Sequence, residues 1–260
     1  MHAFRCHPFF RLGLFLILFA TTHSSVIVQG ASRPNVIVMI SDDQGYGDFG
    51  FQGNPILRTP NLDAMARQSA QMTQYYVSPV CAPTRACLMT GRYNYRTRCI
   101  DTYIGRAMMD PEERTLAEYL FDAGYATGMF GKWHLGDAAG RYPTDQGFDE
   151  WYGIPNSSDQ AFWPDSDSFQ EDSGVAFTRV MSSNKGEEPK SLDIYDRNKR
   201  RLIDREITTK ALEFIDRQSK QKKPFFTYLP NTQTHEPVDA HPDFKGSTGN
   251  GSFADAVSYT

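Results

Sequence analysis

Residues 35–41 read Asn35-Val-Ile-Val-Met-Ile-Ser41, a continuous apolar run that follows Pro34 and ends at Asp42 and Asp43. A run of this length without polar alternation is typical of a strand that is buried on both faces of a mainly parallel sheet. We therefore expect this segment to be a central strand, with the two aspartates in the loop that follows it.

Two further strands and three helices are predicted along the chain. Tyr125 to Phe130 and Pro224 to Leu229 have the same apolar character as the first run. Helical patterns lie between the strands, at residues 59–66, 113–123 and 201–223. Thr59 is a cap candidate for the first helix, because Pro60 suits the first helical position. This alternation of strands and helices indicates an α/β fold with a mainly parallel sheet flanked by helices.

Residues 155–200 differ in composition from the rest of the chain. They are rich in Ser, Asp, Asn, Glu and Lys and contain scattered aromatic residues. We interpret them as a long surface excursion, either a lid over a site or, less simply, a small separate domain.

The bulk composition fits one globular domain. The chain has 260 residues, of which 40% are hydrophobic, and a formal net charge of −4. No basic stripe stands out, so nucleic acid is not expected as a partner. An anionic substrate stays open, because a local group of cationic side chains can dominate the field in a pocket.

The first thirty residues have the pattern of a signal peptide. Arg5 and Arg11 are followed by an apolar run from Leu12 to Ala20 and then by small residues. The run is short for a membrane span, although a retained N-terminal anchor is the competing interpretation. We expect residues 1–31 to be a signal peptide and 32–260 to be an exported domain with no membrane attachment after cleavage.

Three groups of polar residues follow the predicted strands. Asp42 and Asp43 follow the first strand, Lys132 and His134 the second, and His235 the third. Sites in open α/β sheets gather at the carboxyl ends of the strands, so these groups are expected to converge. Taken singly, each has an ordinary alternative: paired aspartates cap turns, and histidines are often buried for structural reasons.

A cysteine segment adds a nucleophile candidate to this group. Residues 81–92 read Cys81-Ala-Pro-Thr-Arg-Ala-Cys-Leu-Met-Thr-Gly-Arg92. An inert thiol at a helix N-terminus is the ordinary alternative for Cys81. Because Cys6 would leave with the signal peptide, three cysteines remain, an odd number for an oxidising compartment. Cys87 and Cys99 are either a disulfide pair or two unpaired apolar residues.

The chain resembles the N-terminal half of a type I sulfatase of the arylsulfatase group, within the alkaline-phosphatase superfamily. The similarity runs from Pro34 to the end, in several motifs in family order. They are Asp42-Asp-Gln-Gly-Tyr-Gly-Asp48, Thr59-Pro-Asn-Leu-Asp63, the 81–92 segment, Gly128-Met-Phe-Gly-Lys-Trp-His-Leu-Gly136, Gln146-Gly-Phe148 and His235-Glu-Pro237. Thr84 stands where serine is commoner in the family, while the cysteine, proline and arginine of the signature are kept.

The resemblance implies an alkaline-phosphatase-like fold and a sulfate ester as substrate. It also implies that a formylglycine-generating enzyme oxidises Cys81 to formylglycine, whose hydrate attacks sulfur. The site roles that it implies are one Ca²⁺ ion at Asp42, Asp43 and residue 81; the hydrate held by Arg85 and His134; sulfate bound by Lys132; and His235 as substrate contact and proton donor to the leaving alcohol.

The sequence departs from the family in what it lacks. The sulfatase family has a later Asp-Asn pair that completes the calcium shell and a further lysine on the sulfate, and neither is found up to Thr260. Two carboxylates are few for Ca²⁺, which takes six to eight oxygens. Our hypothesis is that residues 32–260 are an incomplete catalytic domain, truncated at the C-terminal end and catalytically weak or dead.

Three rival functions remain open. A phosphodiester or phosphonate ester hydrolase of the same superfamily is the nearest, because phosphate and sulfate are both tetrahedral oxyanions. A non-catalytic binding remnant is the second, and a cysteine hydrolase that pairs Cys81 with His134 or His235 is the third. An exported protein would be periplasmic or extracellular, or lysosomal in a eukaryote, where Asn156 and Asn250 begin glycosylation sequons.

Overall fold

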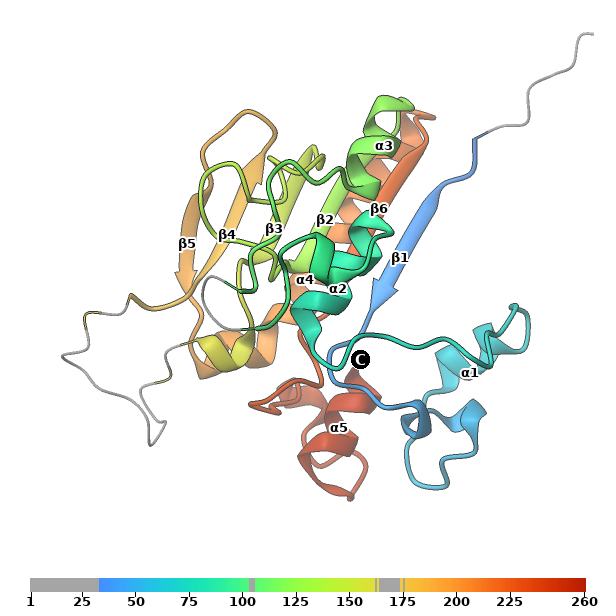
Figure 1. Ribbon diagram of the computed structural model, residues 1–260. Helices are drawn as coiled ribbons and strands as arrows, with labels where there is room; N and C mark the ends of the chain where they lie inside the picture. Colours follow the sequence, from blue (N-terminus) through green and yellow to red (C-terminus); the bar gives the residue numbers. More distant parts are fainter. Residues whose placement is uncertain (1–32, 103–105, 162, 164–173, 175) are drawn as a thin grey trace, which may run out of the picture. The chain divides into compact units, whose positions relative to one another are not determined.

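The computed structural model describes residues 33–260 apart from 103–105, 162, 164–173 and 175, so the predicted signal peptide lies outside the described residues. Six strands form one sheet in the order β1-β6-β2-β3-β4-β5 (Figure 1). Their bounds are β1 Val36–Ile40, β2 Ala126–Lys132, β3 Glu150–Ile154, β4 Arg179–Asn184, β5 Lys190–Ile194 and β6 Phe225–Pro230.

The framework of the sheet is parallel, as the sequence predicts. β1, β6, β2 and β3 run in the same direction, with Tyr228 of β6 opposite both Val38 of β1 and Met129 of β2. β4 and β5 continue the sheet beyond β3 as antiparallel strands, on the side away from β1. Because the four parallel strands share one direction, the loops after β1, β2, β3 and β6 all leave the same edge of the sheet.

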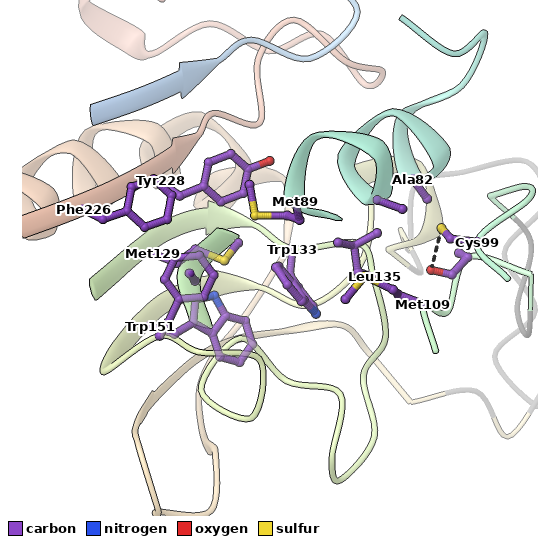
Figure 2. Packing of buried hydrophobic residues seen from close by; sticks show 14 of the residues in the cluster. Ala82, Met89, Cys99, Met109, Met129, Trp133, Leu135, Trp151, Phe226 and Tyr228 are labelled. Atoms are coloured by element: carbon purple, nitrogen blue, oxygen red, sulfur yellow. Dashed lines mark hydrogen bonds between the residues drawn. The ribbon is translucent and has the colours of Figure 1, made fainter. Parts of the chain in front are cut away.

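Helices cover both faces of this sheet. Within the described part of the chain the α-helices are α1 Pro60–Ala66, α2 Cys81–Thr90, α3 Leu116–Asp122, α4 Arg197–Lys220 and α5 Gly251–Tyr259. α4 packs on β2, β6 and β3 through Ile203, Ile207 and Phe214. α2 and α3 pack on the opposite face, where Met89 of α2 lies in the cluster that also holds Trp133 and Tyr228 (Figure 2). The result is a layered α/β unit.

Local sequence features explain where the helices begin. Thr115 accepts the backbone N–H of Glu118, and the Glu118 carboxylate accepts the N–H of Thr115, so a capping box starts α3. α3 therefore begins at Leu116, three residues later than the predicted start at Glu113. Pro60 is the first residue of α1, as predicted. Thr59 occupies the N-cap position, as predicted, but its hydroxyl bonds the side chain of Asp63 and the N–H of Gly50 and makes no side-chain cap hydrogen bond.

The prediction that the first strand is buried on both faces is wrong. β1 is an edge strand that pairs only with β6 among the described strands. Its side chains alternate between half-buried and exposed, and Ile37 and Met39 are 49% and 57% exposed. A continuous apolar run does not distinguish a central strand from an edge strand with one open face, and that is the physical reason for the error.

The interpretation of residues 155–200 as a surface excursion is wrong in part. Residues 179–194 contain the β4–β5 hairpin, which extends the main sheet. Val180 of this hairpin and Tyr195, which follows it, are buried in the hydrophobic core. Much of the remaining excursion lies outside the described residues.

Within the described part of the chain, no helix is both long enough and apolar enough to span a bilayer.

Gly131, one residue before Lys132, is predicted to tolerate no side chain. It has φ +139°, and a Cβ built on it would lie 2.0 Å from the carbonyl oxygen of Pro230 on the neighbouring strand. We expect Gly131→Ala to lower the free energy of unfolding by about 3 kcal/mol or more, because backbone must move in the middle of the sheet. Urea denaturation measures the change.

Gly140→Ala is the matched control for that substitution. Gly140 also has a positive φ, of 78°, but a Cβ there meets nothing within 4 Å. Gly140→Ala should lower the free energy of unfolding only by the penalty for a left-handed backbone at a residue with a side chain, about 1–2 kcal/mol. Equal losses in the two variants would contradict the assignment of the Gly131 effect to the approach of Pro230.

Candidate active site

The loops at the carboxyl edge of the sheet bring the predicted site residues together. Asp42 and Asp43 follow β1, Lys132 ends β2, and His235 follows β6. The expected convergence is realised most closely between Asp42 and Lys132, whose Oδ2 and Nζ are 2.5 Å apart. Both side chains are buried although they are 90 residues apart in the chain.

Two cations hold the carboxylate of Asp42. Lys132 Nζ contacts Oδ2, and Arg85 Nη2 donates to Oδ1 over 3.1 Å. Burial by itself raises the pKa of Asp42, but Lys132 and Arg85 outweigh burial and hold this pKa well below its usual range. The three side chains therefore form a buried cluster with one negative and two positive charges.

Helix α2 delivers both Cys81 and Arg85 to this cluster. Pro83 lies in the first turn, where an α-helix has no intrahelical partner for its N–H groups. Gly91 ends the helix in the left-handed region, at φ 66°. Arg85, one turn after Cys81, also donates from Nη1 to the carbonyl oxygen of Lys132 over 2.8 Å. The N-terminus of α2 is thereby tied to the end of β2.

His134 lies directly beside Cys81. Its Nδ1 is 3.2 Å from Cys81 Sγ. Burial and then the positive charges of Lys132 and Arg85 push the pKa of His134 well below its usual value. The imidazole is therefore neutral at physiological pH and is able to accept a proton from a group at residue 81.

His235 is in a different electrostatic setting. Its Nδ1 lies 2.8 Å from the carbonyl oxygen of Glu236, which places the proton on Nδ1 of the neutral ring. Nε2 is 3.5 Å from Asp43 Oδ2 and 3.6 Å from Asp159 Oδ1. Burial lowers the pKa of His235, but hydrogen bonding to Cys81 and the charge of Asp42 raise it above the ordinary value overall. His235 therefore holds a proton more readily than an ordinary histidine.

Sequence reasoning missed Ser157 as a member of the site. This buried serine follows β3, and its Oγ accepts from Lys132 Nζ over 2.9 Å and lies 3.4 Å from His235 Nε2. It therefore links the two cationic groups. The available signal was a polar Asn-Ser-Ser run after a strand, but β3 itself was not predicted and the run was assigned to the surface excursion.

The described residues do not form a complete site for the predicted Ca²⁺ ion. Asp43, unlike Asp42, is largely exposed and faces His235. Among residues 33–260, gaps excepted, no group of three or more His, Cys, Asp or Glu side chains is arranged to hold a metal ion. Two adjacent carboxylates have suitable hard oxygens but fall short of six to eight donors. Asp42 and Asp43 are candidate ligands that do not complete a shell.

The cysteines of the described chain are all unpaired. Cys81, Cys87 and Cys99 are free thiols, so of the two alternatives for Cys87 and Cys99 the structure has the unpaired one. Cys99 is buried and donates to the carbonyl oxygen of Ala107 over 3.3 Å, whereas Cys87 is only half-buried.

Cys99 is expected to resist alkylation. Burial, and secondarily the thiols of Cys81 and Cys87, raise its pKa to about 12, so the reactive thiolate is scarce until the pH approaches that value. At pH 8, iodoacetamide should modify Cys87 at least about tenfold faster than Cys99. Peptide mass spectrometry over time measures both rates, and the difference should vanish in urea. Equal rates in the folded protein would contradict the burial of Cys99.

Comparison with known proteins places this geometry in a family. The Sulfatase family model matches residues 34–257. The chain is 36% identical to N-acetylgalactosamine-6-sulfatase of Sus scrofa over 93% of this chain and 47% of that protein. It is 33% identical to arylsulfatase A of Homo sapiens over 87% of this chain and 46% of that protein. The chain thus spans about half the length of the curated relatives it matches.

Solved structures agree with the fold. The PsFucS1 sulfatase from Pseudoalteromonas sp. superposes with a TM-score of 0.77 at 26% identity, over 86% of this chain and 49% of that chain. Ps i-CgsB, solved with k-i-k-neocarrahexaose, gives 0.69 at 29% identity, over 87% and 52%. The predicted alkaline-phosphatase-like α/β fold and the predicted resemblance are confirmed. The chain belongs to the sulfatase family.

Proposed function

We propose that this chain hydrolyses sulfate esters, with a formylglycine derived from Cys81 as the nucleophile. The observation that carries the proposal is the position of Cys81 at the N-terminus of α2. It lies 3.2 Å from the neutral His134 and on the same helix as Arg85, which reaches the Asp42–Lys132 pair. These contacts join a nucleophile, a proton acceptor and two cations, which suit transfer of the sulfuryl group from an anionic sulfate ester.

Residue 81 suits the modified group. It is half-buried at a helix end, so a substrate has access to it in the folded protein. A hydrated aldehyde there supplies two hydroxyl groups on one carbon, one to attack sulfur and one to expel sulfate. A formylglycine-generating enzyme is accordingly the maturation partner in this proposal.

The surrounding side chains have distinct tasks. His134, with its lowered pKa, accepts the proton of a hydroxyl at residue 81 through Nδ1. Lys132 stabilises the negative charge on the sulfate oxygens, and Ser157 keeps Lys132 in place. Arg85, one helical turn after residue 81, holds the hydroxyl groups of that residue. His235, protonated on Nε2, gives its proton to the leaving alcohol.

For calcium, the proposal names candidate ligands only. Asp42 and Asp43, together with the group at residue 81, would contribute to one Ca²⁺, which polarises a sulfate oxygen as a Lewis acid when bound. The remaining donors would be water or other oxygen atoms, since no group of three or more His, Cys, Asp or Glu side chains forms a metal site within the described residues.

The substrate class proposed is a sulfated carbohydrate. N-acetylgalactosamine-6-sulfatase is named for a sugar sulfate, and Ps i-CgsB was solved with a neocarrahexaose. An exported protein, as the predicted signal peptide implies, would meet such polymers in the periplasm, outside the cell or in a lysosome.

The test uses the 260-residue protein made together with a formylglycine-generating enzyme. Turnover of an aryl sulfate in the presence of Ca²⁺ is compared with turnover of an aryl phosphate diester. The proposal expects the sulfate to be preferred and the activity to disappear in Cys81→Ala. Preference for the diester would instead favour a phosphoesterase, and a stable fold with no turnover of any ester would favour a binding remnant.

A cysteine hydrolase is the second candidate, favoured by the contact between Cys81 and His134. An ion pair between a thiolate and an imidazolium is what activates such enzymes. The lowered pKa of His134 opposes that ion pair. Full activity in protein made without the converting enzyme, lost on alkylation of Cys81, would support this candidate over the sulfatase.

A further inference from the structure

The segment that carries His235 is held from behind by helix α4. Residues 231–237, called here the His235 loop, follow β6 and lie against the first turns of α4. Arg200 of α4 is completely buried, although arginine is rarely buried without partners. Its guanidinium is directed into the His235 loop.

The guanidinium of Arg200 donates hydrogen bonds to oxygens at several positions of the His235 loop. Nη1 donates to Thr232 Oγ1 over 2.5 Å, and Nη2 donates to the carbonyl oxygens of Thr232 and His235 over 3.0 and 2.8 Å. Nη2 also reaches Gln233 Oε1 at 3.2 Å, and Nε reaches the carbonyl oxygen of Pro237 at 3.2 Å. The rigid guanidinium fork therefore fixes the backbone on both sides of His235.

Asp204, one helical turn after Arg200, holds the donors of the same loop. Its carboxylate accepts the backbone N–H groups of Thr232 and Gln233 over 2.8 and 3.1 Å. It lies 3.9 Å from Arg200 Nη1 and is buried. The two residues thus compensate each other's charge while they bind the N–H and C=O groups of one loop.

The opposite side of the His235 loop is fixed to the loop after β1. Asp42 N–H donates to the carbonyl oxygen of Gln233 over 2.9 Å, and Thr234 N–H donates to that of Asp42 over 2.6 Å. The loop therefore lies between α4 and the candidate metal ligands. A shift of Arg200 would move His235 relative to residue 81 and Ser157.

We propose that Arg200 is a positioning residue for the reaction, which holds His235 where it can protonate the leaving alcohol. The proposal rests on the role of His235 in the proposed function. Arg200 touches neither residue 81 nor Lys132 in the described contacts, so it acts through the loop. Asp204 supports it by keeping the guanidinium in place.

The first test measures the loop directly and needs no turnover. Arg200→Lys keeps the positive charge but cannot reach the same set of acceptors with one ammonium. Amide hydrogen exchange should become at least about tenfold faster in residues 231–237, while amides of β2 keep their rates. Unchanged loop exchange, or an equal increase in β2, would overturn the proposal.

A matched control comes from the same helix. Arg205 is about half exposed and pairs with Asp243 over 2.9 Å on the surface. Arg205→Lys makes the same chemical change without touching residues 231–237 in the described contacts. It should leave exchange of the His235 loop within about twofold of the parent protein, since surface ion pairs contribute little.

The second test separates positioning from simple support of the fold. Proton donation matters most for a poor leaving group, so Arg200→Lys should lower kcat/KM for a sugar sulfate at least about tenfold more than for a nitrophenyl sulfate. His235→Ala should show the same imbalance. If Arg200→Lys lowered kcat/KM equally on the two esters while His235→Ala still lowered it more for the sugar sulfate, the Arg200 proposal would be overturned and the proposed function would stand. Equal losses in His235→Ala would overturn the acid role of His235 in the proposed function and, with it, the catalytic part of this proposal.

Discussion

Replacing Cys81 with alanine is expected to lower sulfate-ester turnover by about 10⁴-fold or more, because it removes the group that forms the covalent bond to sulfur. The fold should survive. Cys81 is half-buried, and its sulfur loses the contact with His134 Nδ1 and the hydrogen bonding to His235. Steady-state kinetics on an aryl sulfate, with thermal unfolding of the same sample, measures both effects.

Two variants control the Cys81 result. Cys87→Ala removes a thiol from the same helix outside the site and should keep turnover within about threefold of the parent, as expected away from the reacting atoms. Cys81→Ser keeps a hydroxyl of similar size but offers only one where the proposed group has two. Near-normal multiple turnover by Cys81→Ser would contradict the need for an aldehyde at this position.

Replacing Lys132 with methionine should destabilise the protein more than a typical substitution. The change keeps the packing of the side chain but removes the ammonium that lies 2.5 Å from the buried Asp42 carboxylate. Breaking a buried ion pair by removing one partner costs about 3–5 kcal/mol, and the remaining Arg85 contact places the expected loss near the lower end. Urea unfolding in the presence of a chelator measures it, and turnover should fall as well because the sulfate loses a cation.

Lys210→Met is the control for that stability measurement. Lys210 is exposed on α4 and pairs with Glu213 over 2.9 Å. Exposed pairs of this kind contribute about 0–1 kcal/mol, so the loss should be small. If Lys132→Met cost no more than Lys210→Met, the Asp42–Lys132–Arg85 cluster would not have the buried, mutually compensating character assigned to it.

The parts of the fold that the sequence predicted are those with strong, long patterns. The apolar runs that became β1, β2 and β6 and the periodic segment that became α4 are all present. The parallel arrangement followed from their alternation, and the convergence of Asp42 and Lys132 followed from the direction of parallel strands. The burial of a strand was harder to predict from sequence, because the apolar composition of β1 does not show that one of its faces is exposed.

The parts that escaped prediction have weak local signals. β5 is exposed along its whole length, and its apolar alternation is limited to Leu192 and Ile194, which is too short to predict a strand. β3 contains Glu150 and Gly153, which are poor strand formers, and it is fixed by pairing with β2. Ser157 and Arg200 were missed for a related reason: their roles depend on partners far away in the chain, such as Lys132 and His235.

Peptide mass spectrometry across residue 81 tests the central claim most directly. The protein would be made in two hosts, with and without a formylglycine-generating enzyme, and the peptide that contains Cys81 and Arg85 would be analysed from each. We predict that the first host yields a peptide lighter by the difference between a thiol and an aldehyde, and the second an intact thiol. An unmodified thiol from both hosts, with the converting enzyme shown to act on another sulfatase, would contradict the proposed nucleophile.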